Sequence, residues 1–392
     1  MTPRPNDVVV VGGGPAGATA AFQLASAGIG VTLIDRAHFP RDKVCGESLS
    51  PGAISRLQAI GMWPAGEVSS ASAPIESMQV RGMRLRSPHG KTFSGHYSGG
   101  KGGIGLVARR TLLDNELVSM ARSRGVRVIE GLEATAAETT LGGGAAISVR
   151  EAGHSSTTRF EARRVIIADG RRSFIARQIG FIEADAPSRG RNRFAVRAHC
   201  EGVSDLSDLA EMQVGRGGYC GLAPLSKTSA NICYVLFTTR LEMRPDTIET
   251  DFQRDIERFP EVARRIGNAR VQGAIRVAGP LRLESRRQAM GPFIACGDTT
   301  GFLDPFTGEG IAHAVATGTL AAKAVQASLS GNPRAFAGYE RDVRSLRRVK
   351  GAAALLLYGL VSRPALADSA AALFSCMPRL ADSVVRLFGD QI

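Results

Sequence analysis

A glycine-rich turn at residues 12–17, with the letters GGGPAG, constrains the fold of this chain more than any other feature. It matches the pattern G-x-G-x-x-G and follows Val8–Val11, a β-branched run typical of a buried parallel strand. A small, alanine-rich segment comes next, Pro15–Ala27, and Val31–Asp35 then has the composition of a second strand. This order of strand, tight turn, helix and strand predicts the βαβ unit that opens a Rossmann-type nucleotide-binding domain.

The residues of this unit match the needs of a dinucleotide. Gly12 permits the tight turn, Gly14 lets the backbone approach a pyrophosphate, and Gly17 allows the helix to pack closely on the strand. The N-terminus of the helix offers free N–H groups to the phosphates, and Asp35 can accept hydrogen bonds from a ribose. The residues predicted to bind the nucleotide are Gly12, Gly14, Pro15, Ala16, Gly17, Asp35 and Arg36.

A second turn, far along the chain, indicates which dinucleotide binds. Gly297-Asp298 follows a late strand, Phe293–Cys296, and a helix rich in small residues begins near Gly310. NAD needs one such turn, whereas FAD is long enough to need two, with Asp298 on a ribityl hydroxyl and the helix N-terminus at the flavin. The FAD contacts predicted in this region are Gly297, Asp298, Pro305, Gly308, Gly310 and Ile311.

The rest of the chain predicts an α/β protein with an insertion. A buried strand at Val165–Ala168 continues the nucleotide domain. In residues 192–277, by contrast, apolar and polar residues alternate as in β-strands, and no βαβ pattern is present. We therefore expect a discontinuous Rossmann-type FAD-binding domain, an inserted β-rich substrate domain and a helical C-terminal tail. The expected bounds are 1–75, 104–185 and 280–334 for the FAD-binding domain, 76–103 and 186–279 for the substrate domain, and 335–392 for the tail.

Composition narrows the classes of partner. Lys and Arg outnumber Asp and Glu by 49 to 36, yet they are scattered as short pairs without interleaved aromatics, so we expect no nucleic-acid binding. The six cysteines contain no CxxC pair, which argues against a disulfide framework and a metal site. No apolar run approaches the roughly 20 residues of a spanning helix, and the first strand begins too early to leave room for a signal peptide. We expect a cytoplasmic protein.

Together, these motifs resemble the superfamily of group A flavoprotein monooxygenases, geranylgeranyl reductases and flavin-dependent halogenases over most of residues 6–330. Asp169-Gly170 is similar to its DG motif and Gly297-Asp298 to its GD motif. Arg110, four residues before Asp114, is similar to an arginine that contacts FAD in an R-x-x-x-D helix start, with Arg109 as the alternative. The resemblance implies FAD as the cofactor, and NADPH, NADH or a reduced carrier protein as a transient electron donor.

Within that superfamily, residues 41–51, RDKVCGESLSP, are similar to the K-x-C-G loop of geranylgeranyl reductases and of flavoproteins encoded beside polyketide synthases. The resemblance places Cys45 and Gly46 against the flavin ring as cofactor contacts. Cys45 is either redox-active or a small packed thiol. Glu47 either exchanges protons with flavin or substrate or is a structural carboxylate. Both are candidate catalytic residues.

One strand of the substrate domain departs from the geranylgeranyl reductases. Their Y-x-W-x-F-P strand corresponds to Tyr219–Pro224, where Gly221 and Ala223 replace the Trp and Phe. Alternate strand residues share a face, so Tyr219, Gly221 and Ala223 are predicted to form one wall, with Tyr219 a candidate catalytic residue. The missing aromatics open space for a bulkier group such as a ring, unless the register is shifted and other side chains refill it. The W-x-W-x-I-P signature of tryptophan halogenases is absent.

The tail carries a basic cluster at residues 341–350, a nearly apolar stretch at 351–361, and a further helix predicted from Ala367 to Phe388. Basic and apolar helices of this kind either rest on an anionic membrane surface or pack over the substrate domain with a solvated basic end. We favour packing and keep peripheral membrane contact as the alternative. His313, in the helix after Gly310, is expected to be structural.

The predicted function is that of an FAD-dependent oxidoreductase acting on an apolar small metabolite. The leading hypothesis is an NAD(P)H-driven monooxygenase that hydroxylates an aromatic or polyketide- or lipid-type substrate. The alternative is reductive saturation of isoprenoid double bonds, as in the geranylgeranyl reductases. Halogenation and a non-catalytic FAD-binding scaffold are less favoured.

Overall fold

The computed structural model describes residues 7–64, 73–97, 103–182, 192–239, 241–302, 306, 308–361 and 363–389, excluding the side chains of 349–358, 360, 361 and 388. Its first sheet has the strand order β18-β19-β12-β1-β2-β8. The strands are β1 (Val8–Val11), β2 (Val31–Asp35), β8 (Arg127–Glu130), β12 (Arg164–Ile167), β18 (Ala289–Met290) and β19 (Phe293–Ala295). All except the edge strand β18 run parallel. Taken in chain order, the parallel strands lie 3-2-1-4-5, the Rossmann arrangement.

The two faces of this sheet are covered by different layers. Because alternate strand residues point to opposite faces, Val8 and Val10 lie in one buried core, under helices, and Val9 and Val11 lie in another. The helices of the first core are α1 (Pro15–Ser26), α2 (Pro51–Ala59), α3 (Arg110–Ser123), α7 (Gly310–Leu329) and α8 (Ala335–Val361). The second core is closed by the short helix α4 (Phe174–Gln178) and the antiparallel sheet β9 (Leu132–Thr139), β10 (Ala145–Glu151) and β11 (Thr157–Ala162).

The sheet β9–β11 was not predicted from the sequence. Much of β9 is only half-buried, and β11 is exposed at most of its positions, so neither has the clean apolar alternation that identifies a strand. Three further short strands, β3 (Ser48–Leu49), β4 (Met78–Val80) and β7 (Gly105–Val107), form a small sheet between the two halves of the molecule.

The substrate half is a sheet of seven strands in the order β17-β13-β16-β15-β14-β5-β6. Its strands are β5 (Gly82–Arg86), β6 (Thr92–His96), β13 (Asn192–Glu201), β14 (Leu209–Gly215), β15 (Gly218–Pro224), β16 (Ser229–Thr238) and β17 (Arg270–Ala278). Tyr219 and Ala223 contribute to the core on one face, and Cys220 and Leu222 to the core on the other. Two helices that the sequence analysis did not predict cover that second face, α5 (Ile248–Ile256) and α6 (Pro260–Ile266).

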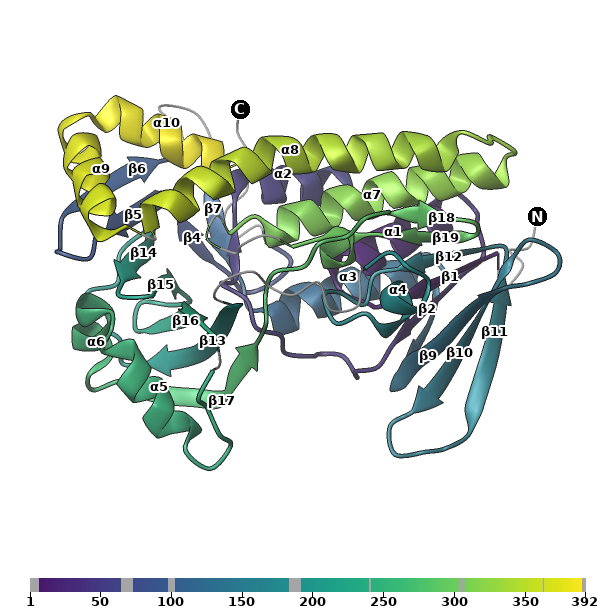
Figure 1. Ribbon diagram of the computed structural model, residues 1–392, viewed down its shortest axis with the longest axis horizontal. Helices are drawn as coiled ribbons and strands as arrows, with labels where there is room; N and C mark the ends of the chain where they lie inside the picture. Colours follow the sequence, from purple (N-terminus) through teal and green to yellow (C-terminus); the bar gives the residue numbers. More distant parts are fainter. Residues whose placement is uncertain are drawn as a thin grey trace.

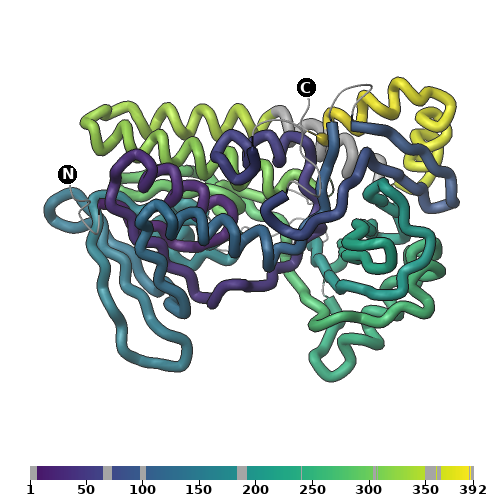
Figure 2. Tube along the Cα trace, turned by 180° about the vertical axis from the view of Figure 1, so that it is seen from behind, coloured from purple at the N-terminus to yellow at the C-terminus, as the bar shows by residue number. Residues whose placement is uncertain are grey.

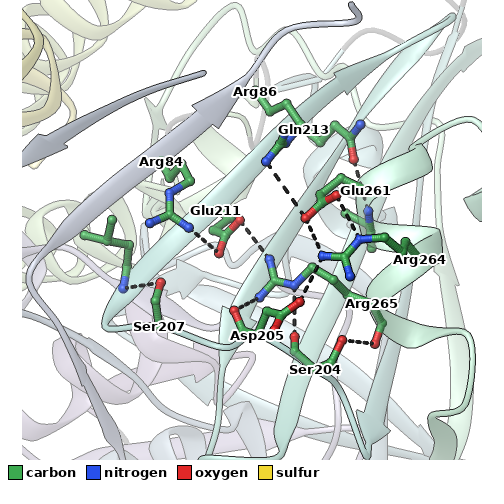
Figure 3. Close-up of polar contacts among 12 residues, drawn as sticks. Arg84, Arg86, Ser204, Asp205, Ser207, Glu211, Gln213, Glu261, Arg264 and Arg265 are labelled. Carbon is green, nitrogen blue, oxygen red and sulfur yellow. Dashed lines mark hydrogen bonds and ion pairs between the residues drawn. The ribbon is translucent and has the colours of Figure 1, made fainter. Parts of the chain in front are cut away.

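Helix α6 is fastened to this sheet by charged side chains (Figure 3). The Glu211 carboxylate lies 3.5 Å from Arg84 and 2.9 Å from Arg265, whose side chain is almost fully buried. Arg265 also donates to the carbonyl oxygen of Ser204, at 3.0 Å. Gln213 accepts from the backbone N–H of Val262 at 3.2 Å. These side chains satisfy one another's charges and hydrogen bonds where α6 packs on the sheet. We therefore assign them a structural role.

The tail consists of α8 (Ala335–Val361), α9 (Pro364–Cys376) and α10 (Pro378–Phe388). Helix α8 lies along α7, and α9 and α10 pack at its end on β6 (Figure 1). The prediction of one helix from Ala367 to Phe388 is wrong, because Pro378 begins a new helix there. His89 pairs with Asp368 of α9, and the backbone N–H of His96 donates to Asp382 of α10 at 2.8 Å. Among the described helices, none combines the length and apolar content that crossing a bilayer requires.

Candidate cofactor and substrate site

Two adjoining cavities lie at the carboxyl ends of β1 and β12, and both are lined by Gly14, Lys43 and Ala168. A nucleotide in a doubly wound sheet binds at this point, where the strand order reverses. The smaller cavity is lined by four of the predicted nucleotide contacts, Gly12, Asp35, Arg36 and Asp169, in addition to Gly14. The other, which we call the larger cavity because it has more lining residues and about 1510 Å³ of empty space including open solvent, extends to the substrate sheet.

The larger cavity collects most of the remaining predicted residues. Gly14, Pro15, Ala16, Cys45, Gly46, Glu47, Arg110, Gly170, Tyr219, Gly297, Asp298, Gly308, Gly310 and Ile311 all line it. Gly17 lies behind the wall, where a Cβ atom would be 1.9 Å from the carbonyl oxygen of Gly12. Pro305 lies outside the described residues. Arg109 lines neither cavity and hydrogen-bonds to Gln272 instead, so of the two adjacent arginines it is Arg110 that reaches the site.

The two distant turns meet in space. A Cβ atom at Gly12 would lie 2.5 Å from the carbonyl oxygen of Ala168, which shows how closely the first turn approaches the end of β12. The backbone N–H of Gly170 donates to the Thr299 hydroxyl at 3.1 Å, tying the DG turn to the short 3₁₀ helix η1 (Gly297–Thr300). Asp298 of that helix lies 4.0 Å from Lys43. Withdrawal from water is the main reason that the pKa of Lys43 is lowered.

The carboxylate of Asp35 is already partly bonded within the protein. It accepts from the backbone N–H groups of Gly13, at 2.7 Å, and Ala37, at 2.8 Å, which orients it at the end of β2. Its neighbour Arg36 is largely exposed and lies 3.6 Å from Glu133. Asp35 therefore has a fixed geometry, whereas Arg36 stands on the rim of the smaller cavity.

Arg41 is a cationic residue of the site that the sequence analysis did not single out. Its guanidinium lies 3.7 Å from Asp35 and 3.3 Å from Asp114, and its Nε is buried without a hydrogen-bond partner. A Cβ atom at Gly14 would lie 3.2 Å from Arg41 Nη2, so the guanidinium covers the turn predicted to hold a pyrophosphate. A buried donor without a partner, beside glycines that leave no room for side chains, fits the phosphates of FAD.

Arg110 begins α3 and is fully buried with Asp114. Its Nε and Nη2 donate to the two carboxylate oxygens of Asp114 at 2.7 and 2.8 Å. Burial alone would lower the pKa of Arg110, but the Asp114 carboxylate and the Cys45 thiol more than offset this, so the pKa is raised overall. The guanidinium is thus a permanent positive charge held at the cavity wall beside Cys45.

The loop predicted to face the flavin is held from several sides. Glu47 is buried and adopts a φ of 59°, in the left-handed region that non-glycine residues rarely occupy. Its carboxylate accepts from the backbone N–H of Arg110 at 3.0 Å and pairs with His199 Nε2 at 2.7 Å. The backbone N–H of Glu47 donates to Cys45 Sγ at 3.3 Å, and Asn231 Nδ2 donates to the Cys45 carbonyl at 2.9 Å.

His199 and Arg197, on β13, are functional candidates that sequence reasoning missed. Arg197 Nη1 lies 3.3 Å from His199 Nδ1. Since a guanidinium only donates, Nδ1 accepts, and Nε2 therefore carries the hydrogen that is donated to Glu47. Arg197 also pairs with Asp42. Burial would raise the pKa of Asp42, but Arg197 lowers it overall. The FAD-binding half and the substrate half are thus joined by one buried polar chain under the loop.

The wall formed by β15 has the predicted orientation. Tyr219 and Ala223 are buried in the core that faces the cavity, and Gly221 lies between them on the cavity wall. A Cβ atom at Gly221 would make ordinary contacts, 3.5 Å from the Cys233 carbonyl oxygen and 3.7 Å from Met212 Cε, so a small side chain fits here and Met212 lies beside the position of the missing aromatic. Tyr219 packs edge-on against Phe306, with ring centroids 4.8 Å apart. Cys233, opposite, has a pKa raised by burial to about 12, so it is a neutral thiol.

His313 has a structural setting. Its Nε2 lies 3.1 Å from the Thr300 hydroxyl, at the end of η1. Its carbonyl oxygen accepts from Thr317, whose hydroxyl also receives the backbone N–H of Gly297 at 2.9 Å. These bonds fix the GD turn on α7.

Comparison with known proteins identifies the family. A family model described as an FAD binding domain matches residues 6–346. Menaquinone reductase of Mycobacterium tuberculosis is 30% identical over 333 residues, which cover 81% of this chain and 76% of that protein. Digeranylgeranylglycerophospholipid reductase of Methanothrix thermoacetophila is 29% identical over 349 residues, 86% of this chain and 83% of that protein.

Solved structures agree on the fold. A flavin-dependent brominase superposes with a TM-score of 0.81 at 20% identity, over 98% of this chain and 93% of its own. A geranylgeranyl bacteriochlorophyll reductase-like protein from Thermoplasma acidophilum superposes with a TM-score of 0.75 at 21% identity, over 99% and 92%. With its Rossmann sheet and its two converging turns, the chain belongs to the FAD-binding domain family, and it is an FAD-dependent oxidoreductase.

Proposed function

We propose that the protein is an FAD-dependent reductase that saturates a carbon–carbon double bond in an isoprenoid-bearing apolar metabolite. The observation that carries this proposal is the cavity that holds Cys45 together with Met83 and Tyr97 in a mostly apolar lining. A lining of this kind suits an isoprenoid chain. The two relatives reported above are named as reductases of menaquinone and of digeranylgeranylglycerophospholipid, and both compounds carry isoprenoid chains. The proposal therefore places reduction ahead of the hydroxylation that the sequence alone favoured.

The chain's own groups fit this chemistry. When bound and reduced, FAD supplies a hydride. The predicted FAD contacts orient it, and the side chains of Val235, Leu281 and Phe302 help to exclude water from the substrate. Cys45 is placed to give its thiol proton to the second carbon of the double bond. The thiolate left behind would face the N–H of Glu47 and the Arg110 guanidinium, two groups that stabilise a negative charge. NADPH, NADH or a reduced carrier protein would restore the flavin.

The test is a product analysis under anaerobic conditions. Purified holoprotein is supplied with a reductant, NADPH or dithionite, and with a substrate, an isoprenoid quinone or a polyprenyl lipid. The molecular masses of the products are then measured by mass spectrometry. Reduction predicts a gain of two hydrogens per double bond without oxygen. A product that carries an added oxygen atom and forms only in air would overturn the proposal. Cys45→Ser, which keeps a proton donor of lower acidity, should slow turnover without changing flavin content.

Hydroxylation is the second candidate, and one specific observation favours it. Gly221 lines the cavity without a side chain of its own, which suits a ring more than a slim isoprenoid chain. A substrate with a ring and an isoprenoid chain would use both parts of the cavity. The same anaerobic experiment separates the two chemistries, because only hydroxylation needs oxygen to form its product.

A further inference from the structure

More than half of the exposed large apolar side chains among the described residues belong to one segment, the tail. Of the nine that are exposed among the described residues, five lie in the tail. Leu366, Leu373, Leu380 and Leu387 recur every seven residues, with Met377 at the break between α9 and α10, and all five are 38–52% exposed. Single exposed leucines are ordinary on a protein surface, but a cluster of this kind marks an interaction site. We call these five residues the leucine face.

The opposite sides of the same helices are already packed. Ala381 and Val385 of α10 lie in the core with Tyr97 and Met83, which line the substrate cavity. On α9, Ala371 is buried in that core and Phe374 stacks on Phe93, with centroids 5.0 Å apart. Residues seven apart lie on one side of a helix, and each leucine pair is turned away from these packed positions. Each helix therefore has two apolar sides, one on the protein and one exposed. Both helices lie at the outer end of the molecule, beside β6 (Figures 1 and 2).

The charges around the leucine face are positive. Arg363 and Arg379 are exposed and Arg386 is half-buried. The two carboxylates of the described part of α9 and α10 face the protein instead, since Asp368 pairs with His89 and Asp382 with His96. Apolar residues flanked by arginines suit an anionic lipid surface. A second copy of the chain would bring arginine against arginine, which argues against self-association through this face.

We propose that the leucine face docks the protein on an anionic bilayer surface. The helices lie in the interface without crossing it, with the leucines in the acyl boundary and the arginines at the lipid headgroups. Because α10 also packs on the cavity wall at Tyr97, a lipophilic substrate would have a short path from bilayer to cavity. The purpose of docking rests on the proposed function, but the docking itself does not depend on it.

The experiment is co-sedimentation of the full-length holoprotein with phosphatidylcholine vesicles, with and without phosphatidylglycerol. We expect binding to the anionic vesicles that weakens as salt is raised. Changing Leu366, Leu373, Leu380 and Leu387 to Gln together should reduce the partition coefficient at least about tenfold. Each of Arg363→Gln, Arg379→Gln and Arg386→Gln should reduce it roughly fivefold. The matched control is Leu141→Gln, a fully exposed leucine on the β9–β10 turn, which should bind as the unchanged protein does.

Three results would overturn the proposal. The first is no binding of the unchanged protein to anionic vesicles. The second is equal loss in Leu141→Gln and in the leucine-face variant. The third is a lipid-free dimer, seen by analytical ultracentrifugation, that the leucine-face variant abolishes, because the face would then bind a second copy. Flavin content and melting temperature confirm that each variant is folded. Since sedimentation needs no turnover, its outcome is independent of whether the reductase assay succeeds.

Discussion

Two parts of the site use glycine in opposite ways: the nucleotide turn of the FAD-binding half and the wall that β15 forms in the substrate half. In the FAD-binding half, a Cβ atom at Gly17 would lie 1.9 Å from the Gly12 carbonyl oxygen, and one at Gly318 of α7 would lie 2.3 Å from that of Ala16. These glycines let backbone approach backbone. On the β15 wall, a Cβ at Gly221 would make only ordinary contacts, the shortest at 3.5 Å, and the residue lines a cavity.

This difference teaches which part of the site can vary. Gly12 and Gly17 of the nucleotide turn are closed in by backbone atoms that cannot move aside, so neither has a substitute. At Gly221 of β15, by contrast, a methyl group fits and the cavity lies beside it, so this residue can change with the substrate. The FAD-binding half determines the cofactor, and the substrate half determines what reacts with it.

The largest expected effect comes from Gly17→Ala. The new methyl group overlaps the Gly12 carbonyl, and because the clash is with backbone, relief requires α1 to move from β1. We expect a loss of about 3 kcal/mol or more in the free energy of unfolding and loss of bound FAD. Flavin absorbance of the purified protein and thermal unfolding with and without FAD measure both. Gly267→Ala is the control, since its Cβ would make only ordinary contacts at 3.5 Å. If the Gly17→Ala protein folded and kept its FAD, the claim that the nucleotide turn accepts no side chain at this position would be wrong.

A smaller but still large effect is expected from His199→Ala, which cuts the connection between the halves. It leaves the Glu47 carboxylate buried with one donor fewer, at a cost of about 2–4 kcal/mol in unfolding free energy. Because Glu47 holds the loop at a left-handed φ, turnover should fall more than tenfold while FAD stays bound. His199→Gln, which keeps a donor, should recover part of the rate.

Two measurements check the role of His199. A double-mutant cycle with Glu47→Gln should give a coupling energy of about 1 kcal/mol or more if the two side chains interact. The control is His154→Ala, an exposed histidine 3.7 Å from the exposed Glu151, which should change stability by less than about 0.5 kcal/mol. Additive effects of the two changes would show that the pair does not join the halves.

How far the sequence predicts this site depends on how locally each part is encoded. The first turn could be predicted because Val8–Val11, residues 12–17 and Asp35 follow one another in a pattern that only a few folds use. The pairing of Glu47 with His199 could not, because it depends on how β13 lies under a loop from the other half. The break at Pro378 is encoded locally, because proline begins a helix but does not continue one. A side-chain network leaves no periodic signal, so it has to be seen in three dimensions.

Gly221→Trp tests the substrate half directly. The indole would fill the open space on the cavity wall, so kcat/KM for a ring-bearing substrate should fall at least about tenfold, a loss of about 1.4 kcal/mol. Flavin content should not change, because the position lies on β15, away from the turns that hold the cofactor. Gly221→Ala is the matched control and should be almost neutral, since its methyl group makes ordinary contacts. Unchanged activity of the Trp variant would mean that the substrate does not use this wall.

The smallest effect, on the affinity for FAD, is expected from a change at Arg41, whose side chain covers the nucleotide turn at Gly14. In Arg41→Gln the side chain that covers Gly14 loses its charge but keeps an N–H donor. We expect the Kd for FAD to rise roughly five- to tenfold, because only part of the roughly 1.5–3 kcal/mol of a charge-assisted hydrogen bond is lost. Reconstitution of the deflavinated protein, followed by flavin fluorescence, gives the Kd. Arg36→Gln, on the exposed rim of the same cavity, should change it less than twofold, because water screens that charge. If the two changes had equal effects, Arg41 would have no special role in binding the phosphates, and the backbone of the glycine turn would hold them without it.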